Sequence, residues 1–335
     1  MTNFADLTTL RVGGPAARLI NATNESDILA ATVEKDLLVI GSGSNLLVSD
    51  DGYSGTVLKI ATRGQKIESD ACSGATVTLA AGEEWDSFVE YAVAHDLAGV
   101  ETLVGIPGLV GAAPIQNIGA YGNEIAKSIA RVRTFDRLSS TITTLAASEC
   151  AFGYRTSRFK AEPDRWIILE VTLQLRIGSE SDPIKYQELA DALGVEIGDR
   201  APLSEVRDAV LDLRKRKGMV LDPGDRDTWS AGSFFMNPII ESVTSARLPE
   251  SAPKWQMSTG VKVSAAWLIE QAGFAKGDRL GGAGISGKHS LALVNAENGT
   301  AAELLALANR IRITVHEKFA IWLEPEVRLI GLVLK

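Results

Sequence analysis

The sequence is poor in the residues that build metal centres and disulfide frameworks. It holds two cysteines, Cys72 and Cys150, far apart and outside any CxxC or Cys/His pattern. Its three histidines, His95, His289 and His316, stand singly, with no HExxH spacing. Zinc sites need such ligands at close, regular intervals. We therefore expect no metal site, no disulfide and a reducing compartment, the cytoplasm.

Long apolar runs and an excess of basic charge are missing as well. No stretch approaches the roughly 18 apolar residues of a membrane-spanning helix, and the N-terminus lacks a basic segment followed by an apolar core. The 34 basic and 42 acidic side chains give a net charge of -8, opposite in sign to the footprint of a nucleic-acid-binding protein. The sequence thus predicts no membrane insertion and no nucleic-acid partner.

What the chain does contain is the material for a large folded core. Of its 335 residues, 45% are hydrophobic, which is enough to offset the chain entropy lost on folding. This length predicts two or three domains, with a boundary near residue 220. Glycine turns and residue periodicity predict strands at 17–22, 37–41, 55–61, 75–82, 291–296 and 321–334, and helices at 85–97, 204–218, 264–273 and 300–319. The order of these elements indicates an α/β or α+β chain.

Two glycine-rich loops have the composition of a phosphate cradle. The apolar run 37–40 leads directly into GSGSN (41–45), and GIPGLVGAAP (105–114) is followed by IQNIGAYG (115–122). Glycines let the backbone approach a ligand, and free N–H groups and hydroxyls donate to an anion. The two loops could hold one diphosphate from both sides. Tight turns between strands are the structural alternative.

Neither of the common nucleotide-binding fingerprints fits. Leu46 stands where GxGxxG requires its third glycine, which disfavours an ordinary Rossmann domain. GAGISGKH (282–289) nearly matches the P-loop, but His289 replaces the hydroxyl residue that binds magnesium. A nucleoside triphosphatase is therefore disfavoured too.

Three further motifs carry polar residues in unusual settings: FGYRTS (152–157), AGSFFMNP (231–238) and LEPEVR (323–328). In an extended strand, Glu324, Glu326 and Arg328 would project from one face. Each motif also has a plain structural explanation, as a surface ion pair, a turn cap or a solvated strand edge.

As an ordered set, these motifs resemble the UDP-N-acetylenolpyruvoylglucosamine reductases, flavoenzymes of peptidoglycan precursor synthesis. The resemblance runs nearly end to end. It is carried by TTLRVGGPA (8–16), VIGSGSNLLVSD (39–50), GIPGLVGAAPIQNIGAYGNEI (105–125), CAFGYRTSRFK (150–160), AGSFFMNP (231–238), HSLALVNA (289–296) and WLEPEVRLIG (322–331). It implies an α+β chain: a FAD-binding fold of the vanillyl-alcohol-oxidase type in two subdomains, plus a third α+β domain that binds substrate. The implied domains are residues 1–69 with 322–335, residues 70–220 and residues 221–321.

The resemblance also implies a reaction. NADPH reduces FAD, and UDP-N-acetylglucosamine enolpyruvate then enters the same cleft and is reduced to UDP-N-acetylmuramate. Hydride from flavin N5 adds to the vinyl terminus, so charge develops on the neighbouring carbon and carboxylate. Arg155 and Glu326 match the residues that stabilise this enol-like species, and Ser233 matches the proton donor. We expect noncovalent FAD, because neither glycine loop holds the histidine or cysteine that tethers flavin in some relatives.

Further site residues follow from the same resemblance. The implied FAD contacts are Gly41, Ser42, Gly43, Ser44, Asn45, Gly105, Ile106, Pro107, Gly108, Gly111, Gln116, Asn117, Gly119, Tyr121 and Arg328. The implied substrate contacts are Tyr154, Tyr186, Arg214, Lys217 and Asn237. Arg214 and Lys217, three apart in a predicted helix, would offer cations from one face to the diphosphate. The chain departs from the family pattern at Ala112, at Met236 and in the long loop 221–230, which bears on the nucleotide pocket more than on the chemistry.

Two other functions stay open on the residues alone. A flavin-dependent oxidase of the same fold would not need Arg155, Ser233 and Glu326 together. A nucleotide-sugar-binding module that has lost FAD would be colourless. The sequence does not distinguish a monomer from an oligomer, and a monomer is compatible with it.

Overall fold

The computed structural model describes residues 2–70 and 74–335, so Cys72 lies outside the described residues. The chain forms two compact units. Unit 1 comprises Met1–Ala17, Gly43–Ser54 and Lys217–Lys335, and unit 2 comprises Arg18–Ser42 and Gly55–Arg216. The chain passes from unit 2 to unit 1 inside the first glycine loop, between Ser42 and Gly43. The three-part division expected from the sequence stays a prediction.

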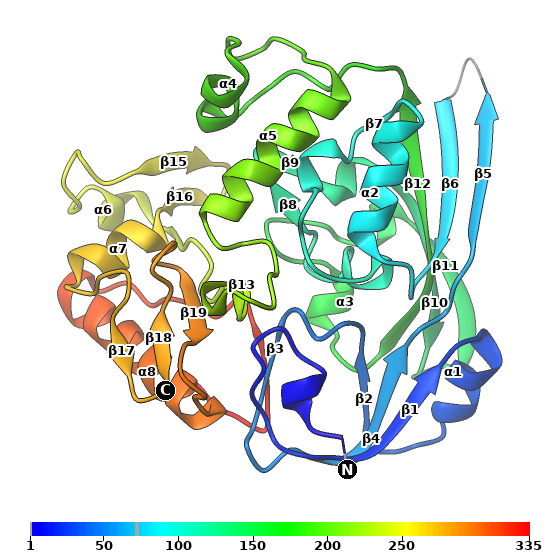
Figure 1. Cartoon of the computed structure of the whole chain (residues 1–335), viewed down its shortest axis with the longest axis horizontal. Helices are drawn as coiled ribbons and strands as arrows, with labels where there is room; N and C mark the ends of the chain where they lie inside the picture. Colours follow the sequence, from blue (N-terminus) through cyan, green and yellow to red (C-terminus); the bar gives the residue numbers. More distant parts are fainter. Residues whose placement is uncertain (1, 71–73) are drawn as a thin grey trace. The chain divides into compact units, whose positions relative to one another are not determined.

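Unit 2 is built around an antiparallel sheet (Figure 1). Its strand order is β11-β10-β12-β6-β5, and β7 also pairs with β12. The strands are β5 (Gln65–Asp70), β6 (Gly74–Ala80), β7 (Leu97–Ala98), β10 (Ile129–Asp136), β11 (Thr141–Ala146) and β12 (Trp166–Ile177). Helix α2 (Trp85–Ala94) buries Trp85, Phe88 and Val89 in the core that also takes Leu79 and Val171 of the sheet. Alternating burial along β6 is the period-two pattern expected of a strand with one covered face.

Smaller elements complete unit 2. A second sheet has the order β1-β4-β2, with β1 (Ala16–Ala22), β2 (Leu37–Ile40) and β4 (Tyr53–Ile60). The helices are α1 (Glu25–Ala31), α3 (Arg158–Ala161), α4 (Gln187–Leu193) and α5 (Leu203–Arg216), and β8 (Gly119–Ala120) forms a hairpin with β9 (Asn123–Glu124). Val206 and Val210, four residues apart on α5, are buried in the core of the unit.

Unit 1 contains small sheets and the long helix α8 (Ala301–Phe319). One sheet has the order β13-β19-β18-β17 and another the order β14-β16-β15. The strands are β13 (Ser230–Ser233), β14 (Ile239–Ile240), β15 (Lys254–Met257), β16 (Gly260–Val263), β17 (Arg279–Leu280), β18 (Ala283–Ile285) and β19 (Ala292–Asn295). Helices α6 (Ser242–Ser245) and α7 (Ala265–Gln271) precede α8. Leu304, Leu307 and Ile311 form the buried stripe of α8, whose N-terminus is capped by Thr300.

The last strand differs from its prediction. The sequence predicts extended structure within 321–334, whereas β20 covers only Arg328–Ile330 and pairs in parallel with β3 (Leu46–Val48). Pro325 makes an isolated antiparallel bridge to Phe235 instead of belonging to that strand. The prediction that Glu324, Glu326 and Arg328 share one strand face is therefore wrong. Proline cannot donate to a ladder, which limits it to such edge positions.

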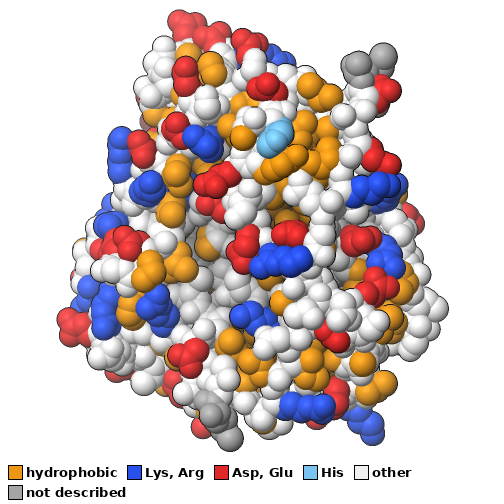
Figure 2. All heavy atoms as spheres, turned by 45° about the vertical axis from the view of Figure 1, so that its right-hand side comes forward, with side chains coloured by type: hydrophobic (Ala, Val, Ile, Leu, Met, Phe, Trp, Pro, Cys, Tyr) orange, Lys and Arg blue, Asp and Glu red, His pale blue; other side chains and the backbone are white. Residues whose placement is uncertain are grey.

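The surface carries charges of both signs. Figure 2 shows acidic and basic side chains interspersed over one face, with hydrophobic side chains between them. Within residues 2–70 and 74–335, no helix combines the length and the apolar character needed to cross a membrane.

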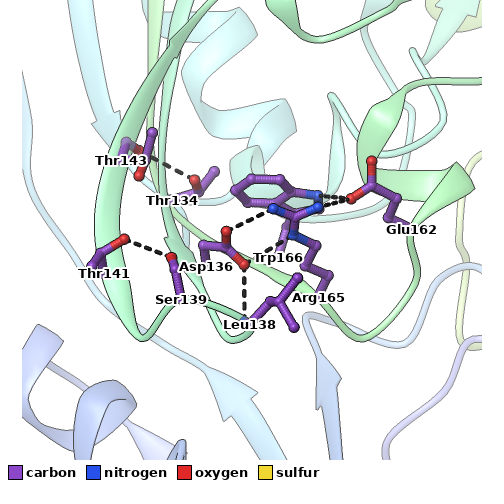
Figure 3. A network of polar contacts seen from close by, with 9 residues as sticks. All are labelled: Thr134, Asp136, Leu138, Ser139, Thr141, Thr143, Glu162, Arg165 and Trp166. Carbon is purple, nitrogen blue, oxygen red and sulfur yellow. Dashed lines mark hydrogen bonds and ion pairs between the residues drawn. The ribbon is translucent and has the colours of Figure 1, made fainter.

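A buried carboxylate anchors the turn between β10 and β11 (Figure 3). Asp136 accepts from Arg165 through Nε at 3.0 Å and Nη2 at 2.8 Å, and from the Leu138 N–H at 2.9 Å. Arg165 also donates to Glu162 at 2.7 Å and lies over the Trp166 ring, 4.4 Å from its centroid. Hydrogen bonding from Arg165 holds the pKa of Asp136 well below its usual range. The ionised carboxylate is thus part of the folded state of unit 2.

We predict that Asp136→Asn lowers the thermal unfolding midpoint at pH 7, and that this deficit narrows in acid. A depressed folded-state pKa contributes stability above the unfolded pKa, near 3.8 for aspartate, and the contribution is lost as pH falls further. Unfolding scans from pH 7 down to about 3 measure the deficit. The exposed Asp51→Asn is the control. A deficit that stays constant with pH would show that lost packing, not charge, is responsible.

Candidate active site

The first glycine loop has a backbone that only glycine accommodates at its centre. Gly43 has φ +67°, and a Cβ there would lie 2.0 Å from the Leu7 carbonyl oxygen. Gly43 is buried, yet within residues 2–70 and 74–335 the N–H groups of Ser42, Gly43 and Ser44 make no hydrogen bond. A buried N–H needs an acceptor. An anionic group such as a diphosphate would supply one, so this loop fits the phosphate part of FAD.

The second glycine loop lies against the first within unit 2. A Cβ on Gly41 would approach the Leu109 side chain to 3.2 Å. The second loop is fastened to unit 2 by its own backbone, because Gly111 N donates to Ala81 O at 2.8 Å. A Cβ on Gly111 would lie 2.6 Å from that of Ala81, so this glycine permits close packing and its N–H is already used. The loop also uses positive φ at Gly105 and Gly108.

Arg155 sits at the tip of a tight hairpin in unit 2. Gly153 and Thr156 exchange backbone hydrogen bonds of 3.0 and 3.2 Å, and Arg155 between them has φ +51°. Its Nη2 donates to Gly119 O at 2.8 Å and its Nη1 to Asn117 O at 3.4 Å. A Cβ on Gly119 would lie 3.1 Å from Nη1, so glycine leaves room for the guanidinium. The structure thus joins the 117–119 loop to the arginine that the sequence singles out.

A second group of predicted residues gathers around Arg214 of α5. Arg214 Nη2 donates to Gly105 O at 3.2 Å, which brings this helix onto the second glycine loop. The rings of Tyr121 and Tyr186 meet edge to face, with centroids 5.5 Å apart. Burial raises the pKa of Tyr121 to about 12, with Glu188 adding to the effect and Arg214 opposing it. Burial lowers the pKa of Arg214 to about 10, so this side chain stays cationic at neutral pH.

In unit 1, backbone pairing joins the segment that follows Ser233 to the segment that holds Glu326. Phe235 bridges Pro325, Glu326 N donates to Phe234 O at 2.8 Å, and Met236 N donates to Glu324 O at 2.9 Å. Ser233 directly precedes this paired segment and lies in β13. Within the described part of the chain its hydroxyl makes no hydrogen bond. The backbone segments that carry Ser233 and Glu326 are thereby joined.

Glu324 and Glu326 have different surroundings. The Glu324 side chain is 60% exposed and pairs with Arg312 of α8 at 3.2 Å. Glu326 is half-buried, on the other side of the Pro325 bridge. Residue periodicity does not distinguish the two glutamates, whereas their positions on either side of the Pro325 bridge do.

Asn45, at the end of the first glycine loop, is tied to the Glu326 segment. Its Nδ2 donates to Glu326 O at 3.2 Å, and its own carbonyl accepts from Arg328 N at 3.0 Å. Thr9 makes a second link, because its hydroxyl donates to Ser230 O at 2.6 Å and its N–H to Gly43 O at 3.4 Å. The first glycine loop is therefore connected to the segment that holds Glu326 and, through Thr9, to β13, which holds Ser233.

The remaining predicted residues divide between the units. Unit 2 holds Gly41, Ser42, Gly105, Ile106, Pro107, Gly108, Gly111, Gln116, Asn117, Gly119, Tyr121, Tyr154, Arg155, Tyr186 and Arg214. Unit 1 holds Gly43, Ser44, Asn45, Lys217, Ser233, Asn237, Glu326 and Arg328.

One of these residues lies differently from expectation, and a second has a contact within the protein while its predicted substrate contact stays a prediction. Lys217 follows the last residue of α5, Arg216, so the prediction that it shares a helical face with Arg214 is wrong. The basic residues at 214–216 already end the helix, and Gly218 with φ +65° turns the chain. Asn237 uses its side chain within the protein, accepting from Ala265 N at 2.9 Å.

Sequence reasoning gave no role to Thr9 or Glu124, although both lie inside matched motifs. The Glu124 carboxylate accepts from Asn117 Nδ2 at 2.9 Å. Cys150, five residues before Arg155, is buried, and burial raises the pKa of its thiol to about 11. Its thiol therefore stays protonated at neutral pH and serves packing.

Comparison with known proteins gives a consistent result. A model of the UDP-N-acetylenolpyruvoylglucosamine reductase C-terminal domain matches residues 222–330, and a FAD binding domain model matches residues 18–145. The UDP-N-acetylenolpyruvoylglucosamine reductase of Cutibacterium acnes is 50% identical over 98% of this chain and 89% of its own. The Streptomyces coelicolor protein of that name is 49% identical over 99% of this chain and 90% of its own.

Among solved structures, the UDP-N-acetylenolpyruvylglucosamine reductase (MurB) of Thermus caldophilus is 28% identical, with a TM-score of 0.69 and 98% of both chains covered. These findings confirm the predicted α+β fold with a FAD-binding part. They also confirm the predicted cofactor, FAD. The chain therefore belongs to the UDP-N-acetylenolpyruvoylglucosamine reductase family.

Proposed function

We propose that this chain reduces UDP-N-acetylglucosamine enolpyruvate to UDP-N-acetylmuramate, with NADPH as the hydride donor. The reaction would serve peptidoglycan precursor synthesis in the cytoplasm, and through it cell-wall growth, cell shape and division. The single observation that supports this most is the pairing of Phe235 with Pro325, which joins the backbone segment next to Ser233 to the one that holds Glu326. An oxidase of the same fold has no need of that arrangement.

FAD, when bound, takes up a hydride from NADPH and delivers one to the substrate. The free N–H groups of Ser42, Gly43 and Ser44 would donate to its diphosphate. The backbone around Gly105 and Gly108 would line the same part of the cofactor. In unit 1, Asn45 and Arg328 would hold the loop in place through their mutual hydrogen bond.

Three side chains would act on the substrate itself. Arg155 would hold the substrate carboxylate, because a guanidinium fork matches two carboxylate oxygens and stabilises charge that develops there. Glu326 would work with Arg155 on the enol-like species. Ser233 would donate the proton to the carbon next to the carboxylate. A serine is a weak acid, but a carbanion-like carbon is basic enough to take its proton when the geometry is fixed.

The nucleotide part of the substrate needs cations in a protein with a net charge of -8. Arg214, cationic at neutral pH, would meet the diphosphate, with Lys217 as a further cation. Tyr154, Tyr186 and Asn237 would contact the sugar nucleotide. NADPH and the UDP-sugar both carry a diphosphate, so we propose that they use one cleft in turn.

Product analysis tests the proposal. Purified protein is incubated with UDP-N-acetylglucosamine enolpyruvate and NADPH without oxygen, and the nucleotide product is identified by mass spectrometry. We expect UDP-N-acetylmuramate in a quantity equal to the NADPH consumed. NADPH consumption that requires oxygen and leaves the substrate unchanged would indicate an oxidase. Colourless protein that binds the UDP-sugar without turnover would indicate a binding module.

We predict that Gly43→Ala purifies with little bound FAD. Alanine would face both the positive φ and the Leu7 carbonyl at 2.0 Å, so the loop and its N–H groups must move. The ratio of flavin to protein absorbance measures the loss, and thermal unfolding checks that the rest of the chain is folded. Gly224→Ala, where a Cβ meets no atom closer than 3.4 Å, is the control. Full FAD content in the Gly43 variant would contradict the proposal that this loop binds the FAD diphosphate.

We predict that Ser233→Ala leaves flavin reduction by NADPH nearly intact and slows reoxidation by the enolpyruvyl substrate. A proton donor is needed only in the second half-reaction, and loss of a positioned acid costs on the order of 100- to 10,000-fold. Stopped-flow absorbance resolves the two half-reactions. The exposed Ser242→Ala is the control. Equal slowing of both half-reactions would assign Ser233 a structural role.

We predict that Glu326→Gln slows flavin reoxidation severely, whereas Glu324→Gln keeps most of it. Both substitutions preserve size and remove one charge. Glu324 is a surface partner of Arg312, and such substitutions stay within about 0.5 kcal/mol of neutral. Single-turnover reoxidation of the two variants decides between the carboxylates. If Glu324→Gln proves the more damaging, the active carboxylate has been assigned wrongly.

A further inference from the structure

Asn117 has a side chain whose hydrogen bonds all run to its own protein. It is 1% exposed, and its backbone has φ +49°. Among the described residues its Nδ2 donates to Glu124 Oε2 at 2.9 Å and to Gly153 O at 3.1 Å. Its Oδ1 accepts from Ala126 N at 3.0 Å. Both amide hydrogens are therefore used, and the side chain has no donor left for a cofactor.

These surroundings fix the orientation of the amide. The carboxylate of Glu124 and the carbonyl of Gly153 are acceptors and need the NH2 end, whereas the Ala126 N–H is a donor and needs the oxygen. If the amide were flipped, its oxygen would face the acceptors Glu124 and Gly153, and its NH2 group would face the Ala126 N–H. The bond to Glu124 is assisted by the carboxylate charge, which makes it one of the stronger contacts in the loop.

The same amide links three segments that converge on Arg155. The first is its own loop, whose carbonyl groups at Asn117 and Gly119 accept from the guanidinium. The second is β9, which carries Glu124 and pairs with the Gly119 strand, β8. The third is the hairpin whose residue Gly153 closes on Thr156 around Arg155. The Asn117 amide therefore holds the acceptors of the guanidinium and the backbone of the arginine in one arrangement.

We propose that Asn117 and Glu124 are positioning residues for Arg155, and that the Asn117 side chain does not contact the flavin. The proposal rests on the proposed function, in which Arg155 holds the substrate carboxylate. A long arginine side chain loses rotamer freedom when it is held in one geometry. The loop carbonyls supply that geometry before substrate arrives, provided that Asn117 and Glu124 keep them in place. A misplacement of about 1 Å at a reacting group can cost on the order of 100-fold in rate.

The test compares variants that keep or remove the hydrogen bonds. Asn117→Asp keeps the size and tolerates the left-handed backbone, but sets a carboxylate against Glu124 and the Gly153 carbonyl. Glu124→Ala removes the acceptor of the Asn117 amide, whereas Glu124→Gln keeps an amide oxygen in its place. Glu90→Ala, an exposed glutamate on α2, is the matched control. FAD content and thermal unfolding are measured for every variant.

We expect Asn117→Asp and Glu124→Ala to retain FAD and to be reduced by NADPH at close to the parent rate. Their reoxidation by the enolpyruvyl substrate should be slower by on the order of 10- to 100-fold. Glu124→Gln should recover most of the rate lost in Glu124→Ala. Adding Asn117→Asp to Arg155→Ala should cause no further slowing, because the positioned group is already gone.

Several outcomes would overturn the inference. Loss of FAD from Asn117→Asp together with full FAD and full reoxidation in Glu124→Ala would make Asn117 a cofactor contact. Equal slowing of both half-reactions would make the network a general structural element. If Arg155→Ala slows reoxidation while Asn117→Asp and Glu124→Ala do not, the inference fails and the proposed function stands. If Arg155→Ala itself reoxidises at the parent rate, the proposed function fails first.

Discussion

The arrangement of unit 1 depends on one short stretch of backbone pairing, between 234–236 and 324–326. Its hydrogen bonds join Glu326 N to Phe234 O and Met236 N to Glu324 O. Because Ser233 directly precedes this stretch, the pairing places its backbone beside the segment that holds Glu326, about ninety residues later in the sequence. Asn45 links this paired stretch to the first glycine loop, because it donates to Glu326 O and accepts from Arg328 N.

In unit 2, a side chain rather than backbone pairing joins two separate segments. The Arg155 hairpin and the 117–119 loop have no shared strand ladder, and the buried Asn117 amide connects them. Both units thus use backbone carbonyls and N–H groups, which have little conformational freedom, to hold the side chains proposed to react. Such preorganisation costs stability in the loops but removes the entropy loss that would otherwise fall on the reaction step.

Local features of the sequence predicted much of the fold. The residue periodicity predicts a helix at 300–319, and α8 is Ala301–Phe319 with Thr300 as its N-cap. Glycine turns bound the strand predicted at 37–41, and β2 is Leu37–Ile40. The motifs, read in order, were enough for the family. The bridge at Pro325 was not predictable, because its partner Phe235 is distant in the chain and periodicity reports only local conformation.

Side-chain roles were the least accessible from the sequence. Nothing in the sequence marks Glu124 as different from other acidic residues. Only its contact with Asn117 in the folded chain indicates a role. The helix α5 ends at Arg216, directly before Lys217, and Gly218 with its positive φ turns the chain after that lysine. The sequence offered no physical reason to prefer Glu326 over Glu324 as the active carboxylate. The ion pair of Glu324 with Arg312 and the bridge at Pro325 supply one.

The redox state of the flavin tests the proposed reaction most directly. The protein is reduced with one equivalent of NADPH in the absence of oxygen, and the visible flavin absorbance is recorded before and after UDP-N-acetylglucosamine enolpyruvate is added. We expect bleaching by NADPH and full recovery of the absorbance by the enolpyruvyl substrate alone. Flavin that stays bleached until oxygen is admitted would contradict the proposed reaction.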